Sequence, residues 1–115
     1  METKDTLAAL TALAHETRLA VFRLLVETGP EGLPVGKIGE RLGLAPATLS
    51  FHLKELAHAD LVITRHERRF IYCSANFATM NGLVAYLTEN CCGGTDTYVP
   101  LCTPMACQPP RKESS

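Results

Sequence analysis

The stretch Leu42–Val62 (LGLAPATLSFHLKELAHADLV) decides the fold of this chain. Gly43 can take the left-handed conformation at which helices stop, so a short helix from about Val35 to Leu42 should end there. Pro46 then stands where proline is tolerated, in the first turn of the next helix. One apolar stripe recurs along that helix at helical spacing, formed by Leu49, Leu53 and Leu56. The pattern predicts two helices joined by a tight turn.

The remaining faces of the second helix carry small, hydroxyl and basic side chains. Small hydroxyl residues near a helix N-terminus can reach phosphates and base edges in a major groove without steric clash. We therefore expect this helix to contact DNA through Ala47, Thr48, Ser50, Phe51 and Lys54.

A basic hairpin is predicted to follow the two helices. Residues 61–65 and 69–73 are rich in β-branched and aromatic side chains, and the polar His66-Glu67-Arg68 between them predicts a tight turn. Such a hairpin can hold phosphate or a narrow minor groove through arginines, and the candidates are Arg65, Arg68 and Arg69. Helix, turn, helix and hairpin in this order predict a mainly α fold with a β-hairpin wing (α+β), a winged helix-turn-helix.

Length and charge agree with a small DNA-binding protein. The chain has 115 residues and a net charge of −1, but residues 37–70 carry six basic side chains against four acidic ones. The positive charge therefore gathers on the predicted DNA-facing half. No stretch approaches the ~20 apolar residues that span a bilayer, and no secretion signal is evident. We expect a cytoplasmic protein with no membrane partner.

Further helices are predicted on both sides of this module. Two amphipathic helices precede it, separated near His15-Glu16-Thr17; Gly29-Pro30 ends the second, and Glu31–Pro34 is expected to be a loop. Their apolar stripes comprise Leu7, Leu10, Leu13 and Ala14, and then Leu19, Phe22, Leu25 and Val26. A last helix ends near Asn90, with a stripe formed by Phe77, Met80, Leu83, Val84 and Leu87.

A small winged domain does not need both terminal helices for its own core. We expect them to pair across a two-fold axis in a homodimer, which would place two recognition helices one turn of DNA apart. The alternative is that they only cap the core of a monomer. The predicted dimer contacts are Leu7, Leu10, Leu13, Leu83 and Leu87.

The five cysteines divide into two groups. Cys73 lies in the second wing strand and is expected to be a small core residue. The other four belong to a flexible tail, residues 91–115, that follows a DNA-binding and dimerisation domain at residues 1–90. Their spacing is not that of a zinc site, which favours cysteines two to four residues apart. Adjacent thiols suit trivalent arsenic or antimony better, and thiol oxidation is the competing interpretation.

From about Leu7 to Leu87 the chain resembles the ArsR/SmtB family of metal-responsive winged-helix repressors. The resemblance rests on the runs Leu10–Arg18, Ser50–Leu56 and Ala59–Val62, although the family usually has glycine where Asp60 stands. The run Leu87–Cys92 resembles the arsenic-sensing subgroup, whose thiols sit at the end of the last helix.

The resemblance implies a repressor rather than an enzyme, one that binds operator DNA without a cofactor and controls an arsenic-resistance operon. As(III) or Sb(III) would release it by binding Cys91, Cys92 and Cys102, with Cys107 as the alternative third ligand. A repressor of the same fold that answers to thiol oxidation, persulfides or methylated arsenicals is the alternative. Zinc sensing is not implied, because Asn76–Met80 offers no histidine.

Overall fold

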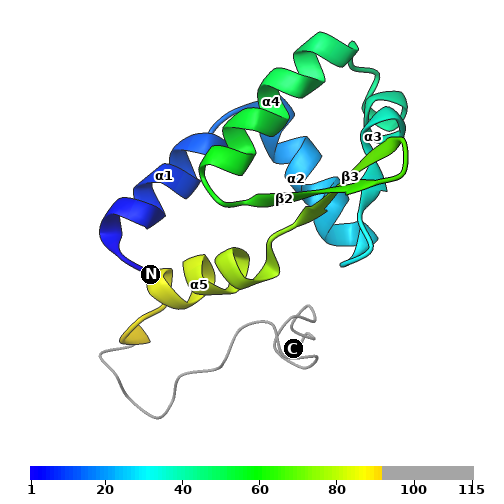
Figure 1. The fold of residues 1–115 in the computed structure, drawn as a ribbon. Helices are drawn as coiled ribbons and strands as arrows, with labels where there is room; N and C mark the ends of the chain where they lie inside the picture. Colours follow the sequence, from blue (N-terminus) through cyan, green and yellow to red (C-terminus); the bar gives the residue numbers. More distant parts are fainter. Residues whose placement is uncertain (92–115) are drawn as a thin grey trace, which may run out of the picture.

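The computed structural model describes residues 1–91, so that Cys92, Cys102 and Cys107 lie outside the described residues. Five helices and three strands follow one another along this part of the chain (Figure 1). They are α1 (Thr3–Leu13), α2 (Glu16–Thr28), β1 (Leu33–Pro34), α3 (Val35–Leu42), α4 (Pro46–His58), β2 (Val62–Glu67), β3 (Phe70–Ala75) and α5 (Phe77–Leu87). The winged helix-turn-helix is confirmed, with α3 and α4 as the helix pair and β2–β3 as the wing.

The sheet has one strand more than the sequence indicated. β1 pairs antiparallel with β3, so the order is β1-β3-β2, and Leu33 stands opposite Cys73. The prediction of a loop over Glu31–Pro34 was therefore wrong for its last two residues. Gly32 enters this strand with φ at +75°, and a Cβ there would lie 2.3 Å from the carbonyl oxygen of Cys73. Only glycine allows β1 to approach β3 so closely.

The turn of the wing lies further along the chain than expected. Glu67 pairs with Phe70, which leaves Arg68 and Arg69 as a two-residue loop and places Arg65 within β2. Arg68 has φ at +56° and Arg69 does not share that conformation. A positive φ at the first loop residue alone is the pattern of a type II′ turn, which normally has glycine there. The arginine accordingly costs about 1–2 kcal/mol in backbone energy.

The helix boundaries around the reading module follow their predicted signals. Gly43 ends α3 in the left-handed region, at φ 66° and ψ 38°, and Pro46 occupies the first turn of α4. Asp60 has φ at +65° just beyond α4, in the place where the resemblance leads one to expect glycine. Aspartate tolerates this conformation better than most residues.

The face of α1 that packs into the core is not the leucine stripe that the sequence predicted. The buried face of α1 consists of Thr6, Ala9 and Ala12, whereas Leu7 and Leu10 are exposed. Small residues let α1 lie close to the rest of the core, so the prediction that its leucines form the buried face was wrong. On α2, Phe22 and Leu25 are buried as predicted, but Leu19 is exposed.

The last helix ends earlier than the sequence suggested. α5 stops at Leu87, and Asn90 turns the chain with φ at +58° before Cys91. Within residues 1–91 no helix is long and apolar enough to cross a membrane.

Candidate nucleic-acid interface

Helix α4 presents two contrasting faces. Its stripe of Leu49, Leu53 and Leu56 is buried as predicted. All five predicted DNA contacts on this helix are exposed: Ala47, Thr48, Ser50, Phe51 and Lys54. The N-cap residue, Ala45, makes no side-chain hydrogen bond to the first turn. Without a side-chain cap, backbone N–H groups of the first turn can donate hydrogen bonds to phosphate oxygens.

The wing lies beside this exposed face. Ser50, Lys54 and Ala57 of α4 line one cleft of about 230 Å³ together with Thr64, Ile71 and Cys73 of the wing and Val35 of α3. A hydroxyl and an ammonium group from the helix thus stand next to the two wing strands. The arrangement offers one continuous surface to which both elements contribute.

The three arginines of the wing have different surroundings. Arg68 and Arg69 form its exposed loop. Arg65 instead lies over the ring of Tyr72 at 4.7 Å, forms an ion pair with Glu67 and donates a hydrogen bond of 3.3 Å to the carbonyl of Glu31. Its guanidinium fastens the wing to the loop before β1. Arg65 therefore has a structural role that the sequence did not reveal.

Behind α4 lies a polar cluster that the sequence also did not reveal. His52 is only 7% exposed, and its Nδ1 lies 3.3 Å from Nη1 of Arg18. Arg18 also donates from Nε to the carbonyl of Ala12 at the end of α1, at 2.7 Å. The ring of His15 is 4.7 Å from that of His52, centre to centre. Burial lowers the pKa of His52, and the nearby His15 and Arg18 lower it further against the opposing influence of Glu55.

The described cysteines occupy different environments. Cys73 is fully buried in β3, as predicted, and burial raises the pKa of its thiol to about 11. Cys91 is half-buried, and its backbone N–H donates to the carbonyl of Thr88. Within residues 1–91 no three side chains of the types that bind metals are grouped so as to hold an ion.

The terminal helices lie next to each other, and three of the five leucines predicted for the dimer are exposed on them. Leu7 and Leu87 are each 59% exposed and Leu10 is 39% exposed. Leu13 is partly buried against the core, and Leu83 lies within it at 8% exposure. Leu83 therefore supports α5 from the inside of the protomer instead of presenting itself to a partner.

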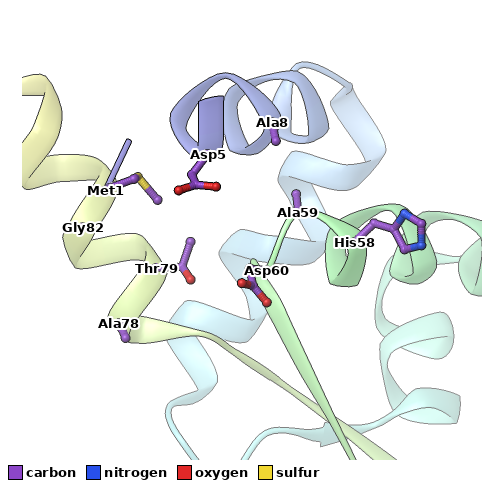
Figure 2. Close-up of a pocket in the computed structure, with 9 residues that line it drawn as sticks. All are labelled: Met1, Asp5, Ala8, His58, Ala59, Asp60, Ala78, Thr79 and Gly82. Carbon is purple, nitrogen blue, oxygen red and sulfur yellow. The ribbon is translucent and has the colours of Figure 1, made fainter. Parts of the chain in front are cut away.

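A cleft of about 390 Å³ separates α1, α5 and the end of α4. Figure 2 shows Asp5 from α1 and Thr79 from α5 on opposite sides of it, with Asp60 at its lower edge. The ring of His58 points away from both aspartates. Among the described residues that line this cleft, no acid, base and nucleophile converge.

Comparison with known proteins agrees with this geometry. A helix-turn-helix domain family matches residues 13–65, which contain α2, α3, α4 and the start of the wing. The HTH-type transcriptional regulator YceK of Bacillus subtilis is 41% identical over 63 residues, 55% of this chain and 62% of YceK. The nodulation protein NolR of Rhizobium meliloti is 31% identical over 80 residues, 70% of this chain and 63% of NolR. The chain thus spans somewhat less than two thirds of the length of these two relatives.

Solved structures extend the likeness to the whole fold. NolR from Sinorhizobium fredii is 31% identical with a TM-score of 0.59, over 75% of this chain and 83% of NolR. The chain belongs to the ArsR-type family of winged helix-turn-helix regulators. A "possible transcriptional regulator for arsenical resistance" is 26% identical with a TM-score of 0.61, over 69% of this chain and 79% of that one.

A more distant solved structure shares the fold. A homodimeric winged helix-turn-helix DNA-binding domain from Mycobacterium bovis, described as a possible ArsR-family regulator, has a TM-score of 0.60 at 23% identity. The match covers 84% of this chain and 89% of that domain. Its likeness concerns the architecture alone.

Proposed function

We propose that this chain is a transcriptional repressor that binds operator DNA as a homodimer and is released by a thiol-binding inducer. The observation that carries the DNA-binding part is the shared surface of α4 and the wing. Thr48 and Ser50 would enter the major groove with the N-terminal half of α4, while Lys54, Arg68 and Arg69 would bind phosphates beside it. Arg65 would contribute mainly by holding the wing in place.

The terminal helices would form the dimer. The apolar side chains of Leu7, Leu10 and Leu87 are exposed and do not pack into the core of the protomer. Exposed apolar side chains on two neighbouring helices are of the kind that an interface between protomers would bury. The homodimeric domain from Mycobacterium bovis has the same architecture. A two-fold pair would present two α4 helices to successive major grooves of a palindromic site.

The inducer would be trivalent arsenic or antimony, bound by Cys91, Cys92 and Cys102, with Cys107 as the alternative third ligand. Cys91 supports this proposal because it follows α5 by a single turn and so couples any tail site to a terminal helix. A ligand can release DNA only to the extent that it binds the free form better than the DNA-bound form. A coupling of about 1–3 kcal/mol is typical and would suffice.

Selection from a random pool of DNA duplexes tests the DNA-binding part. The expected result is a palindromic consensus with half-sites about 10 base pairs apart. Ser50→Ala should weaken binding to the consensus more than to unrelated DNA, because a groove contact carries sequence information. Lys54→Ala should weaken binding to both DNAs about equally, because phosphate contacts carry none. Enrichment of no sequence, with equal effects of the two variants, would contradict the proposal.

Direct metalloid binding tests the inducer part without DNA. Arsenite added to the reduced protein should produce the near-ultraviolet absorbance of arsenic–thiolate bonds, and Cys91→Ser should abolish it. Cys73→Ala is the matched control. The thiol that it removes is buried, so this variant should leave the titration unchanged. Binding of methylarsenite alone would point to the two-thiol alternative, and absence of both signals would point to thiol oxidation.

A further inference from the structure

We propose that Arg18 and His52 form a positioning pair that holds recognition helix α4 in its DNA-binding orientation, and that the pair operates only while His52 is uncharged. The consequence is a repressor whose affinity for DNA falls when the medium is acidified. This inference rests on the proposed DNA binding and goes beyond it, since it concerns residues that do not touch DNA.

The pair joins three helices at a single point. Arg18 of α2 donates one hydrogen bond to the carbonyl of Ala12 in α1 and is directed with Nη1 at Nδ1 of His52 in α4. The planar guanidinium fixes both partners at once, since its donors project in a rigid fork. His52 lies directly between Phe51 and Leu53, one exposed and one buried. A rotation of α4 that moved its DNA-facing residues would therefore break the contact to Arg18.

The chemistry of the two groups dictates the state of His52. A guanidinium only donates hydrogen bonds, so Nδ1 of His52 must accept and cannot carry a proton. The ring proton consequently sits on Nε2. A second proton could enter only at Nδ1, where it would remove the acceptor and place a positive charge 3.3 Å from Arg18. Protonation of His52 and the Arg18 contact are thus mutually exclusive.

The surroundings favour the uncharged ring. Arg18 of α2 and His15, the N-cap residue of α2, face His52, and both oppose a positive charge on its ring. Glu55, one turn along α4, is the acidic group that acts on it, but its side chain is exposed. The last turn of α1, which contributes Ala12, has no basic side chain. Burial opposes a charge on His52 as well, in agreement with the lowered pKa of this residue.

The test is operator affinity measured by fluorescence anisotropy between pH 8 and pH 5.5 at constant salt, with the selected duplex. Wild type should bind more weakly as the pH falls, by up to about tenfold per pH unit, the limit for one linked proton. This direction is diagnostic, because charging exposed histidines would strengthen binding to a polyanion. His52→Asn keeps an acceptor at the position of Nδ1 for Arg18 without a titrating group and should abolish the acid loss. His58→Asn, at an exposed histidine on the same helix, should retain the acid loss.

A wild-type affinity that is constant or rises toward pH 5.5 would overturn the inference, as would an acid loss that persists in His52→Asn. Nitrogen-15 spectra of the wild-type histidines at pH 7.5 supply a test that needs no variant. They should show the proton of His52 on Nε2, and a proton on Nδ1 would overturn the pair. If no duplex is bound at any pH, the proposed function fails, while these spectra still decide the state of the pair.

Discussion

The hydroxyl groups of Thr3 and Tyr86 share a hydrogen bond that joins the first turn of α1 to the last turn of α5. Met1, which precedes α1, lies close to Gly82 of α5. The two ends of the described chain are thereby tied into one surface, although the winged module separates them in sequence (Figure 1). Cys91 follows the end of α5 by four residues, and α5 contacts α1 through Tyr86 and Thr3.

Substitution of Leu7 by glutamate should weaken the dimer. Leu7 is exposed on α1, and burial of a leucine contributes about 1.5–3 kcal/mol. Loss of that contribution in both protomers predicts a dimer dissociation constant raised by roughly 100-fold or more. Sedimentation or light scattering over a concentration series measures it. Phe70→Ser removes an equally exposed apolar side chain at the wing tip and should leave the dimer unchanged; equal behaviour of the two variants would argue against the predicted interface.

Arg68 and Arg69 should respond differently to replacement by glycine. Arg68→Gly removes a backbone cost of about 1–2 kcal/mol, which outweighs the 0.5–1 kcal/mol that glycine costs in chain entropy. Arg69→Gly brings only that entropic cost, so denaturant unfolding should find Arg68→Gly the more stable variant. Both should lower the slope of log affinity against log salt by about 0.9, one phosphate contact each. A more stable Arg69→Gly would contradict the assigned turn.

Gly32 and Gly36 provide a matched pair four residues apart. Gly32→Ala forces a Cβ to 2.3 Å from the carbonyl oxygen of Cys73 at a positive φ, so it should separate β1 from β3. We expect a loss of about 2 kcal/mol or more in the free energy of unfolding. Gly36→Ala meets nothing within 4 Å inside α3 and should stabilise the protein by about 0.5–1 kcal/mol. Thermal denaturation measures the stability of both variants. Similar stabilities would refute the close approach of β1 to β3.

The buried thiol of Cys73 predicts a loss of stability in alkali. Its pKa is raised from 9.0 to about 11 in the folded protein, so between these values the unfolded chain releases a proton that the folded chain retains. Its contribution is therefore complete below pH 9 and declines as the pH rises toward 11, by at most about 1.4 kcal/mol per pH unit. The measurement is the difference in unfolding free energy between wild type and Cys73→Ala across that range. A difference that does not change with pH would contradict the burial of this thiol.

The parts of the fold that were predictable from sequence are those set by local chemistry. Gly43 and Pro46 mark the turn between α3 and α4 because each restricts the backbone in a known way. The exposed face of α4 follows from the leucine period that buries the opposite face. The strand β1 was missed because its two residues are held only by pairing with β3, which lies about forty positions away. The position of the wing turn was mispredicted because Arg68 has a positive φ, which glycine or asparagine normally indicates and arginine does not.

The candidate site was predictable to the same extent. The exposed side chains of α4 could be located because the leucine period of this helix matches the face that the core buries. Arg65 and His52 could not be assigned in full, because their roles depend on Tyr72, Glu31 and Arg18, residues brought near only by tertiary packing. On α1, close packing selected Ala9 and Ala12 for the core, so the leucines that looked like core residues became surface ones.

Release of operator DNA by arsenite tests the central claim most directly. Fluorescence anisotropy would follow the labelled duplex under reducing conditions while arsenite is added to wild type, Cys102→Ser and Cys73→Ala. The account predicts release of wild type and Cys73→Ala and retention of DNA by Cys102→Ser, since only the last lacks a proposed ligand. Wild type that stays bound to its operator at saturating arsenite would contradict the account.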